Sequence, residues 1–418
     1  MNQPQLKAAH EAAHLDFLDV RRRTAELAAP LCVEDQVIQS MPDASPTKWH
    51  LAHTTWFFER FILADHCPGY VPVNEQFFYL FNSYYNTVGP MHTRPHRGLL
   101  SRPTVAEIQD YRAIIDERML DWLDVTTLTD AQRFLLTLGM HHEQQHQELI
   151  LTDIKHALAQ NPMLPAYKQL AVPDSVSTPM NFVTIDEREC ANGFEGDGFA
   201  FDNETPRHKV LVHAHALADR LVNNSEYQAF IDDGGYSTAE LWLSEAWSVI
   251  QERGWQRPIY WQPDNQSEFT LSGVRELDPN APVVHLSLYE ADAFARWADA
   301  RLPTETELEC VAADQAVDGN FYESGFLHPV APQASDGSLR QVFGDVWEWT
   351  GSSYGPYPGF KPLAGSLGEY NGKFMCSQHV LRGGSCVSPV SHLRPTYRNF
   401  FYPDSRWQFT GVRLAKDL

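Results

Sequence analysis

The strongest constraint on the fold is a change of sequence texture at residues 161–179. This stretch, NPMLPAYKQLAVPDSVSTP, carries four prolines and little periodicity, which is typical of a linker. On its N-terminal side, apolar residues recur at helical spacing in four segments, 12–29, 45–64, 104–124 and 130–158. On its C-terminal side, short β-like runs alternate with Gly-rich turns. The sequence therefore predicts an α+β protein, with one domain at 1–160 and another at 180–418.

Four long helices predict a helical bundle, and the core of a bundle is a natural place for metal ligands. The chain between the second and third helices, residues 65–103, is long, irregular and rich in Pro, Gly, Asn and aromatic residues. A loop of that length in a compact domain is often functional. We therefore expect this loop to contribute residues to a site.

The fourth predicted helix contains the histidine-rich stretch HHEQQHQE. Residues four apart lie on one face of a helix, so His142 and His146 point the same way, with Gln145 beside them. His141 is rotated by about 100° from His142. Glu148 points nearly to the opposite side, and we expect it on the surface or behind the ligands. A metal bound here would take the two histidines and need a third ligand from another segment.

The second predicted helix, in WHLAHTTWFFERFIL, offers two further histidines. His53 lies about 40° from the centre of the apolar stripe of this helix, whereas His50 is displaced by about 100°. His53 is therefore the better candidate to reach the bundle interior. A lone inward histidine can also be a hydrogen-bonded core residue, but beside a pair at i, i+4 it predicts a site of three imidazoles. Such a site suits Zn, Fe(II) or Cu, and spacing does not choose among them.

The charge balance disfavours two classes of partner. The chain has 32 basic and 54 acidic residues, a net charge of −22, so phosphate backbones and anionic membranes should repel it. We find no signal-peptide pattern at the N-terminus and no stretch long and apolar enough to span a membrane. The six cysteines form no CxxC pair. These features predict a cytoplasmic protein with reduced thiols that binds neither nucleic acid nor membrane.

The motifs of both halves resemble known domains. WHLAHTTWFFE, FNSYYNTVG and HHEQQHQE resemble the DinB-like metal-binding domain of the ergothioneine-pathway sulfoxide synthases. In the second half, FGDVWEWT, LRGGSC and FTGVRLA resemble the formylglycine-generating-enzyme and sulfatase-modifying fold, a C-type-lectin-like domain. The matches follow the family's order over nearly the whole chain. The resemblance implies a DinB-like four-helix bundle joined to a lectin-like domain, with the active site where the domains meet.

The resemblance also implies a reaction. The family joins the sulfur of a thiol to the imidazole C2 of hercynine, with dioxygen as oxidant and a sulfoxide as product. It implies a non-heme Fe(II) held by His53, His142 and His146, with hercynine, cysteine and O2 as substrates. Open alternatives are γ-glutamylcysteine or a selenium donor, an ovothiol precursor made from histidine, a zinc-dependent thiol transferase and a non-catalytic binding module. The oligomeric state stays open.

The resemblance assigns roles to residues of the first half. Tyr84 and Tyr85, in NSYYN, are the candidate catalytic proton donors. Arg94 and Arg97, in MHTRPHRG, would clamp the carboxylate of the thiol substrate, although exposed arginines are common and the pair could also offset local acidity. Gln145 would hydrogen-bond the substrate imidazole rather than serve as a polar filler of the bundle.

Three residues of the second half complete the expected substrate contacts. Asn399 matches a family residue that contacts hercynine, and Phe400 could face its trimethylammonium group by cation–π attraction. Members that use γ-glutamylcysteine are expected to carry an acidic residue at the position of Phe401. Phenylalanine cannot meet the glutamyl ammonium group, which favours free cysteine as the sulfur donor.

The resemblance does not extend to formylglycine chemistry. Formylglycine-generating enzymes carry two cysteines shortly after RGGS, where this chain has Ser388 and Leu393. Cys386 has no cysteine close to it in sequence and is expected to be a small buried residue. We therefore expect the C-terminal fold to bind substrate.

Overall fold

The computed structural model describes residues 3–333 and 337–418. The chain divides into two compact units, each built from two segments. The first unit combines Met1–Pro162 with Leu363–Tyr370, and the second combines Met163–Pro362 with Asn371–Leu418. The helical unit therefore takes a short segment from far along the chain, in addition to the predicted N-terminal region.

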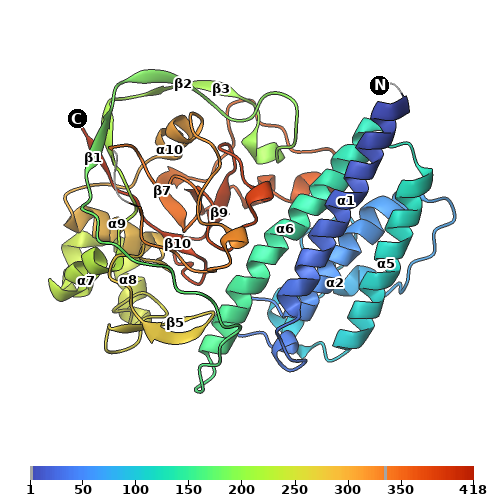
Figure 1. Cartoon of the computed structure of the whole chain (residues 1–418), viewed down its shortest axis with the longest axis horizontal. Helices are drawn as coiled ribbons and strands as arrows, with labels where there is room; N and C mark the ends of the chain where they lie inside the picture. Colours follow the sequence, from blue (N-terminus) through green and yellow to red (C-terminus); the bar gives the residue numbers. More distant parts are fainter. Residues whose placement is uncertain (1–2, 334–336) are drawn as a thin grey trace. The chain divides into compact units, whose positions relative to one another are not determined.

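The first unit is a bundle of four long helices, as predicted (Figure 1). They are α1 (Gln3–Ala28), α2 (Thr47–Phe58), α5 (Val105–Val125) and α6 (Asp130–Ala159). α2 packs against both α5 and α6, and every residue of α2 is buried. The chain continues from α2 through a π-helical turn, Glu59–Leu63, into α3 (Ala64–His66). The central position of α2 places all its faces, not only its apolar stripe, inside the bundle.

Capping residues explain where the third and fourth long helices begin. Thr104 accepts a hydrogen bond from the backbone of Glu107, and Thr129 accepts one from the backbone of Gln132. The side chains of Glu107 and Gln132 in turn accept a hydrogen bond from the backbone N–H of the cap residue, so both starts are capping boxes. The irregular stretch between α3 and α5 contains only α4 (Phe77–Leu80) and a 3₁₀ turn, as the sequence predicts for a long loop.

The second unit is built around short strands. Its largest sheet has the order β10-β7-β8-β9, in which β8 pairs antiparallel with β7 and β9. A second sheet has the order β1-β4-β11, and β2-β3 and β5-β6 form two further pairs. The strands are β1 (Phe182–Ile185), β2 (Arg188–Asn192), β3 (His208–Val212), β4 (His215–Ala218), β5 (Ser267–Thr270), β6 (Gly273–Glu276), β7 (Trp347–Ser353), β8 (His379–Arg382), β9 (Asn399–Phe401), β10 (Thr410–Gly411) and β11 (Ala415–Asp417). The helices are α7 (Asn224–Asp232), α8 (Ser244–Arg253), α9 (Leu288–Trp297) and α10 (Glu305–Ala312). This mixture of helices and sheets confirms the predicted α+β class.

Buried ion pairs fix α10 against the largest sheet. Arg382 on β8 donates to Glu309 at 2.6 Å, and Arg398, next to β9, donates to Glu305 at 2.9 Å. All four side chains are buried or nearly so. A buried charge is tolerated where it is paired and hydrogen-bonded, so these pairs hold the start of β9 in place.

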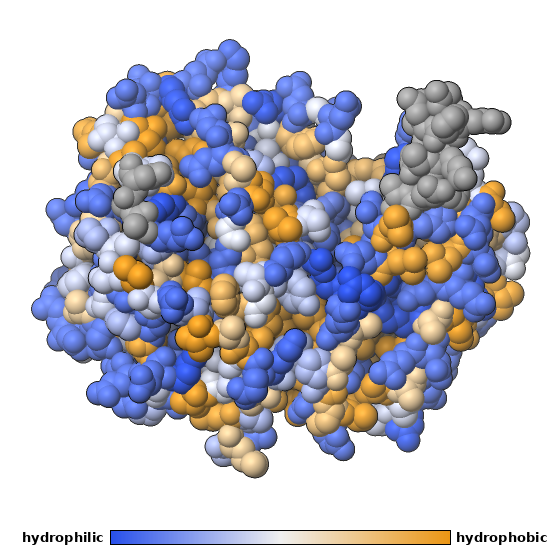
Figure 2. All heavy atoms as spheres, in the orientation of Figure 1, coloured by the Kyte–Doolittle hydropathy of each residue, from blue (hydrophilic) through white to orange (hydrophobic). Residues whose placement is uncertain are grey.

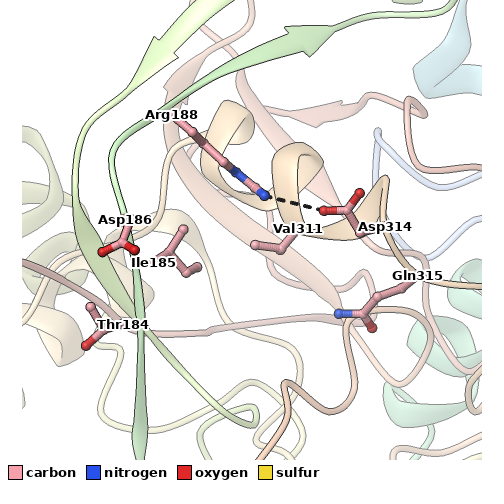
Figure 3. Close-up of a pocket in the computed structure, with 7 residues that line it drawn as sticks. All are labelled: Thr184, Ile185, Asp186, Arg188, Val311, Asp314 and Gln315. Carbon is pink, nitrogen blue, oxygen red and sulfur yellow. Dashed lines mark hydrogen bonds and ion pairs between the residues drawn. The ribbon is translucent and has the colours of Figure 1, made fainter.

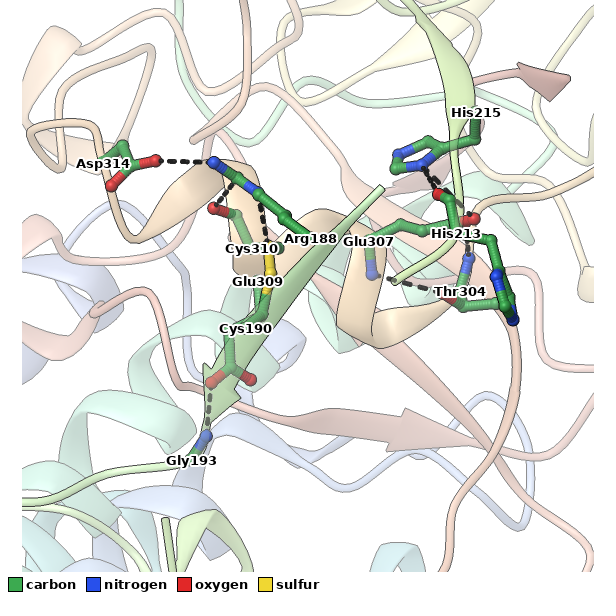
Figure 4. The surroundings of a disulfide bond; sticks show 10 residues. All are labelled: Arg188, Cys190, Gly193, His213, His215, Thr304, Glu307, Glu309, Cys310 and Asp314. Atoms are coloured by element: carbon green, nitrogen blue, oxygen red, sulfur yellow. Dashed lines mark hydrogen bonds and ion pairs between the residues drawn. A yellow bond between two sulfur atoms is a disulfide. The ribbon is translucent and has the colours of Figure 1, made fainter. Parts of the chain in front are cut away.

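The expectation of six reduced thiols is wrong at two positions. Cys190 on β2 and Cys310 on α10 form a disulfide that spans 120 residues of sequence (Figure 4). Arg188 lies beside it and donates to the carbonyl oxygen of Cys310 at 2.7 Å. Cys386 is fully buried, as expected for a small packed side chain. The disulfide was not visible in the sequence because no short spacing links the two cysteines.

In the described part of the chain, the helices are too short or too polar to traverse a lipid bilayer. Figure 2 shows hydrophilic residues spread over the drawn face, with apolar residues among them. A pocket of about 490 Å³ opens in the second unit beside β1 and α10 (Figure 3). Its lining residues include Thr184, Arg188 and Asp314, and none of the predicted site residues lines it.

Candidate metal centre

Three histidines from two helices converge inside the bundle. His53 comes from α2, and His142 and His146 come from α6. One ring nitrogen of each lies within 4.8 Å of the others, and all three side chains are buried. The Nε2 atoms of His53 and His142 are 3.1 Å apart. The structure thus brings together the three side chains that the helix geometry singled out.

The outer ring nitrogens of His53 and His142, Nδ1 in each case, have different surroundings. Nδ1 of His53 lies 2.6 Å from the carbonyl oxygen of Phe81, an acceptor, so this nitrogen carries the proton and Nε2 keeps its lone pair. Nδ1 of His142 is buried and has no hydrogen-bond partner among the described residues. A backbone carbonyl behind a ring nitrogen is a common way to fix the tautomer of a metal ligand.

Burial keeps the cluster neutral. It lowers the pKa of His53 and of His146 well below the ordinary value, and the nearby His142, His50 and Arg97 lower both pKa values further. Burial also lowers the pKa of His142 to about 4. All three imidazoles are therefore uncharged at neutral pH, which is the form that binds a metal ion.

The geometry fits a metal ion. Metal–nitrogen bonds of about 2.1 Å place two ligands at a right angle about 3.0 Å apart, close to the separation of the Nε2 atoms of His53 and His142. Neutral nitrogen donors of this kind suit Zn, Fe(II) and Cu. The three histidines could therefore hold one metal ion and leave coordination positions open.

Aromatic side chains surround the cluster. The indole ring of Trp49 stacks on His53 with a centroid distance of 4.6 Å, and Trp56 stacks on the same ring at 5.5 Å. Phe57 lies against His142 at 4.8 Å. These rings limit the movement of the imidazoles and exclude water, as a reactive metal site requires.

The two predicted tyrosines of the loop lie in different surroundings. Tyr85 is buried, and its ring packs against Trp56 and Phe61. Burial raises its pKa well above the ordinary value, and the nearby Tyr370 and Glu369 raise it further. The hydroxyl of Tyr84 accepts a hydrogen bond from Arg94 at 2.6 Å. Tyr85 is therefore the tyrosine held in a dry environment.

The predicted arginines are tied into the protein. Arg97 is buried, donates to the hydroxyls of Ser45 and Ser83 at 2.9 Å each, and lies 3.4 Å above the ring of Trp49. The alternative of a surface pair is therefore wrong for Arg97. The Nε atoms of Arg94 and Arg97 are buried and have no partner among the described residues. The role of both as a carboxylate clamp stays a prediction.

Gln145 is partly exposed and faces a residue that the sequence did not point to. Its Oε1 accepts a hydrogen bond of 2.8 Å from the hydroxyl of Tyr370, whose ring lies edge-on to His142 at 6.1 Å. Tyr370 belongs to the segment that joins the helical unit. Next to it, Glu369 accepts hydrogen bonds from the backbone of Asn86 and Thr87. No helical or strand periodicity in the sequence marks this segment.

Glu148 is buried, so it is not a surface group, and it does not belong to the cluster.

The remaining predicted contacts lie on β9 of the second unit. Asn399 and Phe401 lie on one face of the strand and Phe400 on the other, because side chains alternate along a strand. The ring of Phe400 stacks on Tyr354 at 4.1 Å. Their contacts with substrate stay predictions.

Comparison with known proteins identifies the family. Residues 164–418 match the sulfatase-modifying factor enzyme 1-like domain, and residues 16–150 match the DinB superfamily. The chain is 33% identical to a hercynine oxygenase of Mycolicibacterium thermoresistibile, over 96% of this chain and 94% of that protein. It is 32% identical to the hercynine oxygenase of Mycobacterium tuberculosis over the full length of both. The chain belongs to the hercynine oxygenase family.

Membership of the hercynine oxygenase family makes the chain an oxidoreductase and confirms the predicted combination of domains. A formylglycine-generating enzyme of Streptomyces coelicolor is 29% identical over 53% of this chain and 84% of that protein. At the two positions where formylglycine chemistry would need cysteines, this hercynine oxygenase family member has Ser388 and Leu393, and both side chains are buried.

Proposed function

We propose that the chain joins cysteine to the imidazole C2 of hercynine and oxidises the sulfur to a sulfoxide, using Fe(II) and dioxygen, in ergothioneine biosynthesis. The observation that carries this proposal is the cluster of three buried imidazoles, in a chain that resembles hercynine oxygenases along its whole length. Fe(II) would supply the one-electron chemistry with dioxygen that side chains lack. His53, His142 and His146 would hold it.

The other residues would bind substrate and manage protons. Gln145 would exchange its hydrogen bond with Tyr370 for one to the substrate imidazole, since an amide both donates and accepts. Tyr85 would deliver a proton, because its raised pKa keeps the hydroxyl protonated until a stronger base forms nearby. Tyr84 is the second candidate for this role. Asn399 and Phe400 would contact hercynine, and Arg94 and Arg97 the carboxylate of cysteine.

The absence of an acidic side chain at position 401 supports cysteine as the donor. Phe401 packs near Trp407, with a centroid distance of 6.3 Å, so this position offers an apolar surface and no charge for a glutamyl ammonium group. The alternatives with γ-glutamylcysteine or a selenium donor keep the same metal centre. We also propose the cytoplasm as the location, since it supplies cysteine in its reduced form; the Cys190–Cys310 bond is then one of the uncommon disulfides of a cytoplasmic protein.

The test is anaerobic reconstitution with Fe(II), followed by oxygen-electrode traces with hercynine and each thiol in turn. We expect oxygen uptake only when hercynine and cysteine are both present, with the sulfoxide identified by mass spectrometry. Faster oxygen uptake with γ-glutamylcysteine than with cysteine would identify γ-glutamylcysteine as the sulfur donor. Turnover by the zinc form without oxygen would favour a thiol transferase, and no metal binding at all would favour a binding module.

A further inference from the structure

A fourth histidine, His50 on α2, touches the cluster from outside. Its Nδ1 lies 2.8 Å from Nδ1 of His146, and its Nε2 lies 3.0 Å from Oδ2 of Asp153 on α6. The same Oδ2 accepts a hydrogen bond of 2.8 Å from the backbone N–H of Ser45. Both His50 and Asp153 are buried. His50 lies off the apolar stripe of α2, but it is buried because every face of α2 is enclosed.

The proton positions along this chain of contacts follow from donor and acceptor chemistry. A carboxylate only accepts, so Nε2 of His50 donates to Asp153. A contact of 2.8 Å between two ring nitrogens needs one donor and one acceptor, so Nδ1 of His146 donates and Nδ1 of His50 accepts when Nε2 of His146 is to bind a metal ion. His146 is left with its lone pair on Nε2, the nitrogen available to a metal ion. Each hydrogen bond in such a chain polarises the next.

The three metal-ligand candidates differ in what holds them. A backbone carbonyl faces Nδ1 of His53, and Nδ1 of His142 has no partner among the described residues. The outer ring nitrogen of His146, in contrast, contacts the side chain of His50, which can be replaced. Ser45 extends the network, because its hydroxyl accepts from Arg97 while its N–H serves Asp153. The loop that carries Arg97 is thereby tied to the support of His146.

We infer that His50 and Asp153 are positioning residues that fix the tautomer and ring orientation of His146 for metal binding. The inference rests on the proposed metal site, and it assigns to α2 a second histidine with a role distinct from that of His53. Loss of a supporting group of this kind commonly weakens metal affinity by about 10- to 100-fold.

The experiment measures Co(II) binding to the purified full-length protein by its visible absorption and by competition with a chelator. His50→Phe keeps a ring of similar size but removes both hydrogen bonds, and we expect about 10- to 100-fold weaker binding with a changed spectrum. In His50→Asn, the amide Oδ1 stands where Nδ1 stood and can still accept from His146. This variant should recover affinity relative to His50→Phe.

A matched control is His285→Phe, which removes a buried histidine of the second unit whose Nδ1 contacts the carbonyl oxygen of Gln408 at 2.8 Å. It should bind Co(II) like the parent protein, and the thermal midpoint of each metal-free variant reports any general loss of stability. Parent-like affinity and spectrum in His50→Phe would overturn the inference. The His146→Ala variant separates the two ideas: if it also binds like the parent, the three-histidine site itself is wrong.

Discussion

The most quantitative prediction concerns Glu143, the neighbour of His142 on α6. Its side chain is fully buried between two arginines: Arg21 donates to Oε2 at 2.7 Å, and Arg112 donates to Oε1. Burial opposes the charge, but attraction to Arg112 and Arg21 outweighs burial and lowers the pKa of Glu143 from 4.5 to about 2. At about 1.4 kcal/mol per pH unit, this shift corresponds to about 3 kcal/mol of stability at neutral pH.

The perturbation is Glu143→Gln, which removes the charge and leaves two buried arginines without their shared partner. Breaking a buried pair in this way costs about 3–5 kcal/mol, in agreement with the value from the pKa shift. Urea denaturation followed by circular dichroism measures the free energy of unfolding of the helical unit. Glu117→Gln, the same change at an exposed position of α5, should stay within about 0.5 kcal/mol of the parent.

The pH dependence of the free energy of unfolding gives a second check that the ionised side chain of Glu143 stabilises the fold. A carboxyl whose pKa is lowered in the folded state stabilises the protein above its unfolded pKa of 4.5, and that stability is lost as the pH falls towards 2. The difference between parent and Glu143→Gln should therefore be constant above pH 5 and shrink below pH 4.5. A loss smaller than about 1 kcal/mol at pH 7 would refute the reasoning about this buried network.

Three further predictions follow from the site and the disulfide. His53→Ala should lose iron retention while circular dichroism still reports the helical fold, and full iron occupancy would remove His53 from the ligand set. Tyr85→Phe should lower kcat by about 100-fold or more with unchanged Fe(II) content, because a general acid contributes at least that much to the rate. A loss of iron in this variant would instead show that Tyr85 has a structural role. Cys190 and Cys310 should resist alkylation in the unfolded protein until a reductant is added, and labelling without reductant would contradict the disulfide. Cys190→Ala should lower the free energy of unfolding by about 5 kcal/mol, since the disulfide closes a loop of 120 residues.

The sequence predicted the parts of the site that depend on local periodicity. The four helices follow from apolar spacing, and the i, i+4 spacing of His142 and His146 places both rings on one face of α6. The angular argument for His53 also placed it inside the bundle. His50 was not predicted to reach the site, because an apolar stripe describes a helix with one buried face and every face of α2 is buried.

The missed features depend on contacts between distant parts of the chain. Tyr370 reaches Gln145 across 225 residues, and no local pattern announces that a short C-terminal segment joins the helical unit. Cys190 and Cys310 are likewise too far apart for spacing to pair them. Buried polar partners such as Asp153 and Glu143 carry no periodic signal either, because they sit at polar positions of an otherwise regular helix.

The most direct test of the central claim is an iron-edge anomalous difference map from crystals loaded with Fe(II) under anaerobic conditions. The account predicts a single peak about 2.1 Å from one ring nitrogen each of His53, His142 and His146. A map without a peak at these rings, or with iron bound elsewhere on the chain, would contradict it.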